Sequence, residues 1–326
     1  MVGIRGLLII PLLLAILVAY LLDPFVSYLE KQRISRGKGI AIVYILLITV
    51  LLLLSLNFIP KLLQELQELV LALPEYTEKL MLFVEKMGEN YHRFNLPDVI
   101  RSSIDESLVE LQRSLTINLE KFSLFILLCF SQAFALFLVP LFSYYLLRDN
   151  ANFKKRFLGL IPEQYRINME ETLRDINKTL GAYLRGVFVN SFSVGAMLYL
   201  GLLILGVKFA LFLGIINALT NVIPYFGPII GAVPVVLIAL LQSPALAWKV
   251  LLLIIIVQQI ESQFIAPQVF GRSMGFHPLT VIIALLLGGL YMGFTGLIII
   301  IPLAAITRAI FRYFSPVVIH ALKRRE

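Results

Sequence analysis

The chain consists mainly of long apolar runs, separated by shorter stretches that carry most of its charged residues. A helix needs about 20 predominantly apolar residues to cross a bilayer, and runs of roughly that length recur along the chain. We therefore predict an all-α, polytopic integral membrane protein with about 7 to 8 hydrophobic segments, some of them broken or re-entrant. The predicted spans are 6–22, 39–59, 122–147, 187–206, 210–241, 249–266 and 279–306.

In residues 61–120, apolar residues recur with the spacing of a helix face instead of forming a continuous run, and acidic residues are frequent. The positions Leu62, Leu66, Leu69, Val70 and Leu73 have the spacing of one helix face,. Leu80, Phe83, Val84 and Met87 repeat this spacing after Pro74,. We predict an extracytoplasmic amphipathic helical module, built as a hairpin, that packs on itself or on neighbouring subunits rather than binding a ligand.

A second amphipathic stretch lies in residues 149–186. Its apolar stripe runs from Met169 to Leu184, and its other face carries Glu170, Arg174 and Lys178. This pattern predicts a cytoplasmic helix that lies along the membrane and contacts lipid headgroups. The expected organisation is then N-terminal transmembrane segments (1–60), the extracytoplasmic module (61–120), one span (121–148), the cytoplasmic helix (149–186) and a transport region (187–326).

Composition agrees with a membrane protein. The 326 residues are 59% hydrophobic and only 15% charged, against about 25% charged in soluble domains, and the mean hydropathy is +0.90. The net charge of +8 does not indicate a nucleic-acid partner, because the basic residues gather at the ends of apolar runs. By the positive-inside rule, 23–38, 148–185 and the terminal 323–325 are predicted to be cytoplasmic and 61–120 external. The first run lacks a small-residue cleavage site, which favours a retained span.

Few features of the sequence support an enzyme. The three histidines, His92, His277 and His320, are far apart in the chain, and no serine lies in a glycine-rich nucleophile elbow,. A single cysteine, Cys129, cannot form a disulfide framework or a multi-cysteine metal site,. We predict no catalytic residues, no metal site and no cofactor.

The stretch 221–234, NVIPYFGPIIGAVP, interrupts an apolar run with three prolines and two glycines. Proline removes a backbone donor and clashes with the preceding turn, so an unbroken helix is not expected here. A second run, 284–302, is interrupted by several glycines before Pro302. Two broken apolar segments indicate half-helices that meet near the membrane midplane at a transport site. For the second run, close helix packing through glycine is the alternative.

Glu261 is the one acid in the predicted spans of the transport region. A carboxylate inside a membrane is costly and is therefore a functional candidate, with Arg272 or Lys249 as a potential partner. The alternative is a structural ion pair. The predicted substrate-pathway residues are Asn217, Asn221, Pro224, Tyr225, Gly227, Pro228, Gly231, Pro234, Gln258, Gln259, Glu261, Gln263, Gly288, Gly289, Gly293 and Gly296. The broken segments could instead serve only as hinges between packed helices.

Several motifs carry a family resemblance. The stretch NVIPYFGPIIGAVP, then QQIESQFIAPQVFGRSMGFHP at 258–278, the glycine-rich ending at Pro302, and YYLLRD at 144–149 resemble the AI-2E (autoinducer-2 exporter) family of permeases along most of the chain. The resemblance implies a multi-pass protein of the bacterial or archaeal cell (inner) membrane. It also implies a homo-oligomer, for which a pentamer is one arrangement, and elevator-like displacement of a small solute. The chain departs from the family pattern at its N-terminus, where a hydrophobic hairpin is common and one span is predicted here.

The solute is the question that the resemblance leaves open. The family is named for export of a small, oxygen-rich furanone used in quorum sensing, whereas some relatives are described as sodium or lithium/proton antiporters. An antiporter needs carboxylates that exchange a proton for a metal ion, and the transport region offers Glu261 without a second acid,. We therefore favour a small neutral polar solute, with the antiporter as the alternative. A non-transporting membrane scaffold is the third hypothesis, which the broken helices disfavour.

Overall fold

The computed structural model describes residues 4–91, 138–270 and 277–323, and these ranges contain helices and no strands. The all-α prediction is confirmed. Helices α1 (Ile4–Lys31), α2 (Arg36–Tyr91), α5 (Leu138–Gly159) and α6 (Glu163–Ile204) precede α7 (Ala210–Thr220) and α8 (Phe226–Gln242). The remaining elements are α9 (Pro244–Ile260), the π-helix η1 (Glu261–Ile265), α10 (Ala266–Phe270) and α11 (Pro278–Lys323).

Within these ranges, four helical stretches are long and apolar enough to cross a membrane: Pro11–Lys31, Arg36–Ala72, Glu163–Ile204 and Pro244–Val269. Shorter apolar helices occur at Ala210–Thr220, Phe226–Gln242, Leu279–Gly293 and Gly296–Phe311. Of the predicted span 122–147, the part before residue 138 lies outside the described residues, and the rest belongs to α5. The protein is a polytopic all-α membrane protein in which full-length and half-length apolar helices are combined.

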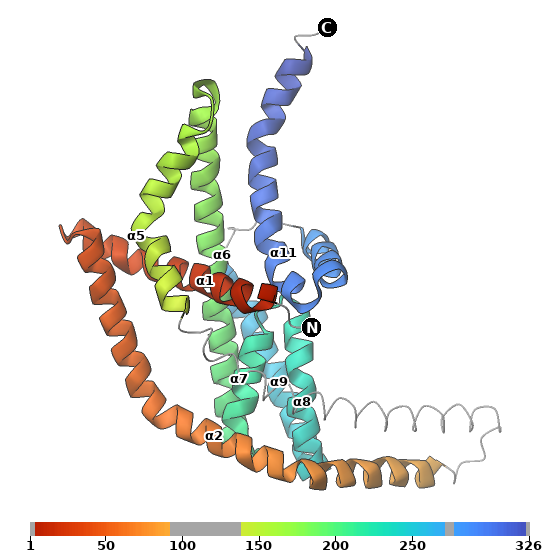
Figure 1. Cartoon of the computed structure of the whole chain (residues 1–326). Helices are drawn as coiled ribbons and strands as arrows, with labels where there is room; N and C mark the ends of the chain where they lie inside the picture. Colours follow the sequence, from red (N-terminus) through yellow and green to blue (C-terminus); the bar gives the residue numbers. More distant parts are fainter. Residues whose placement is uncertain (1–3, 92–137, 271–276, 324–326) are drawn as a thin grey trace.

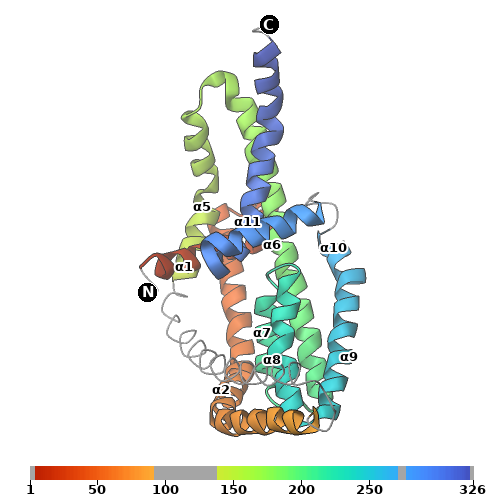
Figure 2. The same ribbon diagram turned by 90° about the vertical axis from the view of Figure 1, so that its right-hand side faces the viewer.

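Helix α6 is the axis of the molecule. In Figures 1 and 2, α7, α8 and α9 run alongside one half of α6, and α5 joins α6 at the other end. The α6–α7 contact is close because both helices have glycine there: a Cβ on Gly195 would lie 2.9 Å from the Gly214 carbonyl oxygen. The predicted surface helix within 149–186 and the span 187–206 belong mostly to this one continuous helix.

Helix α1 runs across α6 rather than alongside it (Figure 1). Its end is fixed by Arg36, whose guanidinium contacts Asp23 at 3.1 Å and Glu30 at 2.9 Å and donates to the Leu147 carbonyl at 2.8 Å. One side chain of α2 thus holds α1 and α5 together. The Tyr20 hydroxyl donates to Asn177 Oδ1 at 2.7 Å, which also joins α1 to α6.

Helix α2 continues from Arg36 to Tyr91 through both Pro60 and Pro74, so neither proline ends it. We call residues 61–76 of this helix the α2 arm. Figure 2 shows the arm passing beneath the ends of α7 and α8. Leu66, Leu69 and Tyr76 of the arm are buried, as the helical spacing predicts for the two leucines, whereas Val70 is exposed. The rest of the predicted module, from residue 92 onward, lies outside the described residues.

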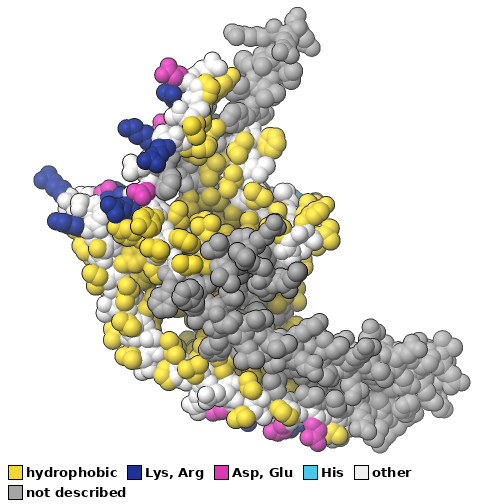
Figure 3. All heavy atoms as spheres, in the orientation of Figure 1, with side chains coloured by type: hydrophobic (Ala, Val, Ile, Leu, Met, Phe, Trp, Pro, Cys, Tyr) yellow, Lys and Arg dark blue, Asp and Glu magenta, His cyan; other side chains and the backbone are white. Residues whose placement is uncertain are grey.

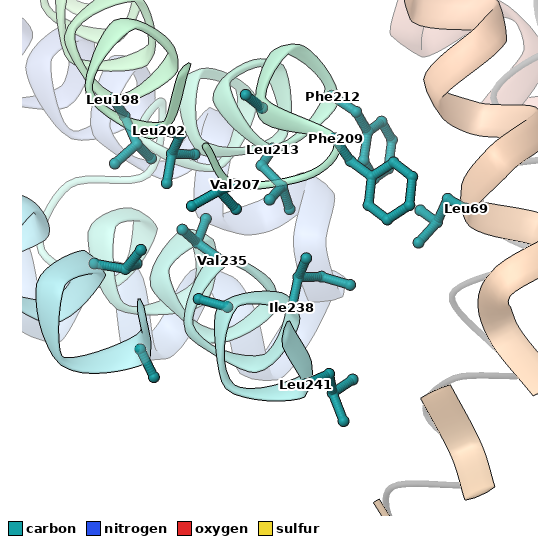
Figure 4. Packing of buried hydrophobic residues seen from close by; sticks show 14 of the residues in the cluster. Leu69, Leu198, Leu202, Val207, Phe209, Phe212, Leu213, Val235, Ile238 and Leu241 are labelled. Atoms are coloured by element: carbon teal, nitrogen blue, oxygen red, sulfur yellow. The ribbon is translucent and has the colours of Figure 1, made fainter. Parts of the chain in front are cut away.

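The arm belongs to the largest apolar core. Figure 4 shows Leu69 facing Phe209 and Phe212 at the start of α7, while Val235 and Ile238 of α8 face α7 from the other side. The Tyr76 and Phe209 rings pack edge to face at 6.4 Å between centroids. This core fixes the start of α7 and the end of α8 against the α2 arm.

Charged side chains differ between the two ends of the molecule. In Figure 3, lysine and arginine gather near the α1–α2 turn and the α5–α6 end, whereas acids mark the visible part of the α2 arm at the opposite end. This distribution agrees with the predicted orientation, in which the basic end is cytoplasmic. The orientation itself stays a prediction.

Candidate functional site

The first break is a tight turn between α7 and α8. Helix α7 ends at Thr220 and α8 begins at Phe226, so the predicted interruption is present but confined to residues 221–225. Tyr225 has φ 64° and ψ −47°, and the Phe226 N–H donates to the Pro224 carbonyl at 2.8 Å. This is a γ-turn with positive φ, a rare and strained conformation. Strained backbone of this kind clusters at functional sites.

The other prolines of this stretch do not break the helix. Pro228 lies in the first turn of α8, where its missing N–H has no helical partner to lose. Pro234 lies inside α8. Gly227 and Gly231 face α7: a Cβ on Gly227 would overlap the Thr220 carbonyl, and one on Gly231 would lie 2.5 Å from Asn217 Nδ2. Both glycines therefore let α7 and α8 pack as a close helical hairpin.

A buried polar cluster lies beside this turn. Asn190 Nδ2 on α6 donates to Glu261 Oε1 at 2.6 Å, and Asn221 Nδ2 at the end of α7 donates to the same oxygen at 3.3 Å. Amide hydrogen bonds to a carboxylate are charge-assisted and stronger than neutral ones. We call Asn190, Asn221 and Glu261 the Glu261 cluster.

In the part of the chain that the structure describes, the cluster, and Ser191 and Asn217 on the same two helices, have buried oxygens without partners. Among the described residues, these buried oxygens have no hydrogen-bond partner: Asn190 Oδ1, Ser191 Oγ, Asn217 Oδ1, Asn221 Oδ1 and Glu261 Oε2. An unsatisfied buried polar group costs about 1–3 kcal/mol, so a native fold rarely keeps several together without a reason. Because the amide nitrogens of Asn190 and Asn221 are already engaged with Glu261, their amide oxygens and Glu261 Oε2 remain as acceptors,. The cluster is suited to groups that donate hydrogen bonds or carry positive charge.

Glu261 also marks a change of helix type. It opens the π-helix η1, and the Ala266 N–H donates to the Glu261 carbonyl five residues back. Short π-helical segments are rare and frequently occur at functional sites. The predicted partner Lys249 is exposed and lies about three turns, roughly 18 Å, earlier along the helix,. Arg272, the other predicted partner, lies outside the described residues.

The neighbouring glutamines do not join the cluster. Gln263 Nε2 donates to Gln259 Oε1 at 2.9 Å, and both side chains are exposed. Gln258 is partly buried. Of the predicted polar residues, the structure therefore brings Asn221 to Glu261, buries Asn217 next to Gly231 of α8, and leaves Gln259 and Gln263 on the surface of the helix.

The second break lies within α11, where Gly293 has the non-helical values φ 60° and ψ −143°. The two halves fold onto each other: a Cβ on Gly288 would lie 2.7 Å from the Gly296 carbonyl oxygen, and one on Gly289 would lie 3.1 Å from Leu297. Leu285 and Ile301 are fully or nearly fully buried in a cluster with Ile223 of the first turn. The two broken segments thus meet through apolar side chains.

Comparison with known proteins identifies the family. A sequence model described as AI-2E family transporter matches residues 5–315. The chain belongs to the AI-2E transporter family. YueF of Bacillus subtilis, named as a transport protein, is 30% identical over 305 residues, covering 92% of this chain and 82% of that protein. PerM of Escherichia coli, named as a permease, is 28% identical, covering 92% and 85%.

In this AI-2E transporter, sequence reasoning missed Asn190, which joins the cluster from α6. A signal was available, because Asn190 stands beside Ser191 within a mainly apolar segment. Helical periodicity alone does not show which neighbouring helix Asn190 faces. Its contact with Glu261 depends on the packing of α6 against η1.

Proposed function

We propose that this AI-2E transporter is an exporter of a small polar solute, such as autoinducer-2, that passes the Glu261 cluster. The observation that carries the proposal is the group of buried, unpartnered oxygens contributed by α6, α7 and η1 within the described part of the chain. A hydroxyl-rich neutral solute would supply the donors that these oxygens lack. The strained turn at Tyr225 lies at the tip of the α7–α8 hairpin, next to Asn221.

An elevator-like displacement is the mechanism that we propose for this exporter. The α7–α8 hairpin is closed on itself through Gly227 and Gly231 and packs closely on α6 through Gly195, which supports movement of these helices as one unit,. Residues 42–59 of α2 are mostly exposed and apolar, so this helix is available to lipid and to a neighbouring copy,. We extend the proposal to a homo-oligomer in the cell (inner) membrane.

Flux in sealed proteoliposomes tests the proposal. Vesicles with the purified protein are loaded with labelled small polyols, and efflux is compared between wild type, Glu261→Gln and the control Ser262→Ala, an exposed residue outside the cluster. We expect efflux in wild type and the control and a reduction of about tenfold or more in Glu261→Gln, from the loss of hydrogen bonds to a charged group. Normal efflux by Glu261→Gln at normal protein yield would remove Glu261 from the mechanism.

Sodium (lithium)/proton antiport is the second candidate, favoured by one specific observation. Among the residues that the structure describes, Glu261 Oε2 and the amide oxygens of Asn190 and Asn221 are buried without partners, and oxygen atoms are the ligands that hard cations prefer,. The same vesicles, loaded with a pH-sensitive dye and exposed to a sodium gradient, measure this activity. Sodium-driven proton movement without polyol efflux would establish the second candidate over the first, and absence of both would indicate a scaffold.

A further inference from the structure

The N-terminus of α7 is capped by a residue from a distant helix. Phe209, the residue before α7, has left-handed backbone and provides no side-chain cap. Instead, Glu65 of the α2 arm accepts hydrogen bonds from the Phe212 N–H at 2.9 Å and from the Leu211 N–H at 3.4 Å. The first N–H groups of a helix have no partner within it, and a carboxylate there also interacts favourably with the helix dipole.

The same turn of the α2 arm also holds α6. Lys61, one turn before Glu65, donates to the Tyr199 hydroxyl at 3.2 Å and lies 5.3 Å from the centre of the Tyr199 ring. Tyr199 in turn packs against α7, since a Cβ on Gly214 would lie 2.7 Å from Tyr199 Cβ. Buried Leu69 adds apolar contact with the start of α7 (Figure 4). The arm therefore fixes α7 by polar and apolar contacts at once.

Helix α7 links this cap to the Glu261 cluster, because Asn221 lies at the end of the helix opposite Glu65. The helix has 11 residues, which corresponds to a length of about 16 Å. Helix formation is cooperative and a helix of about three turns is marginal by itself, so loosening of its first turn also loosens its last turn. Loss of the cap therefore also weakens the position of Asn221 and its hydrogen bond to Glu261.

We propose that Glu65 is a positioning residue for transport: its cap sets where α7 lies and thereby where Asn221 meets Glu261. Glu65 acts through α7 and does not itself contact the solute. The transport part of this inference rests on the proposed function, whereas the positioning part concerns the protein alone. A purely local cap would instead stabilise the first turn of α7 and leave the far end unchanged.

Hydrogen–deuterium exchange in detergent micelles tests the positioning part without any solute. Glu65→Ala removes both acceptors, Glu65→Gln keeps one oxygen acceptor without the charge, and Glu68→Ala is the matched control on the next turn of the same arm. Glu68 accepts a hydrogen bond from Gln64 of its own helix. Loss of an N-terminal cap corresponds to about a fivefold change in a local opening equilibrium. We expect exchange to rise about that much in peptides covering both 210–213 and 217–225 of Glu65→Ala, less in Glu65→Gln, and not in Glu68→Ala.

Exchange that rises only in 210–213, with 217–225 unchanged, would overturn the inference and leave Glu65 as a local cap. If Glu65→Ala does not yield folded protein, Glu65→Gln is judged by the same two peptides. In vesicles, the expected transport signature is a higher KM at unchanged protein yield. Absence of flux in wild type would count against the proposed function alone, because the exchange result decides the positioning role separately.

Discussion

The hairpin of α7 and α8 and the hairpin within α11 are both closed by glycine, yet their surroundings differ. At the first, the turn carries prolines, a strained Tyr225 and the buried amide of Asn221, which reaches Glu261. At the second, the turn lies at Gly293, and the buried side chains around the two halves, such as Leu285 and Ile301, are apolar. Glycine explains close backbone approach in both hairpins. Among the residues that the structure describes, only the first of the two hairpins has buried polar side chains.

From this difference we expect separate roles for the two breaks. A broken helix inside a membrane must satisfy its freed backbone groups, and it does so against protein or a polar cavity. The first hairpin ends beside a polar cluster, so we expect substitutions of its polar residues to change transport. The second hairpin packs through apolar contacts, so we expect its substitutions to change stability.

The largest expected effect is on the second hairpin. Leu285→Ala removes a fully buried side chain and should lower the free energy of unfolding by about 2–5 kcal/mol, because a cavity is left behind. Denaturant unfolding in mixed micelles measures this, with the exposed neighbour Leu286→Ala as control. The KM for the solute should stay unchanged. A raised KM without lost stability would place the second break in the solute path.

Glycine substitutions should affect both hairpins alike. Gly227→Ala and Gly288→Ala each place a Cβ against backbone of the partner half-helix, and each should destabilise by about 1–3 kcal/mol through overpacking. Gly37→Ala is the control, since nothing lies within 4 Å of its Cβ position. Thermal unfolding in detergent compares the three variants. Tolerance of alanine at Gly227 alone would mean that the first hairpin is looser than its geometry indicates.

A smaller effect is expected at the tip of the first hairpin. Asn221→Ala removes one hydrogen bond to Glu261 while Asn190 keeps the other. The KM should rise about fivefold, the equivalent of roughly 1 kcal/mol, at normal protein yield. The exposed Leu219→Ala on the same helix is the control. If Asn221→Ala and Tyr225→Phe both transport every accepted solute normally, the first break is a hinge and not part of the path.

The smallest effect concerns an exposed ion pair on α2, outside both hairpins. The Lys79 ammonium donates to the Glu75 carboxylate at 2.6 Å, and this hydrogen bond holds the pKa of that carboxyl below its ordinary value. Because the folded pKa is lowered, the contribution to stability is present above the unfolded pKa and is lost as pH falls through the folded pKa. Glu75→Gln should therefore make unfolding slightly less sensitive to acid. Melting temperatures of both proteins across acidic pH measure the difference, and an identical pH dependence would show that the exposed pair contributes nothing.

The helical fold and both interruptions could be predicted from the sequence because proline and glycine act locally on the backbone. The restriction of the first break to 221–225 could not, since Pro228 and Pro234 are tolerated by their positions in α8. Nor could the continuation of α2 through Pro60 and Pro74, because neighbouring structure can compensate for a lost helical hydrogen bond,.

The candidate site was predicted only in part. Asn221 and Glu261 stood out as polar residues in apolar segments, but the hydrogen bond between them depends on contacts across the chain. The same is true of Glu65, whose partners Leu211 and Phe212 lie nearly half the chain away. Such long-range pairs follow from helix packing, which a single sequence does not specify.

Helix α6 connects an exposed part of the molecule with the Glu261 cluster. The helix runs without interruption from Glu163, at the end joined to α5, to Ile204, and it carries Asn190 on the way. A fluorescent or spin label at exposed Gln164 would therefore be attached to the same helix as Asn190 of the Glu261 cluster. Distances from that label to a fixed reference would test whether this helix is displaced as the proposed mechanism requires, with no probe placed among the buried polar residues.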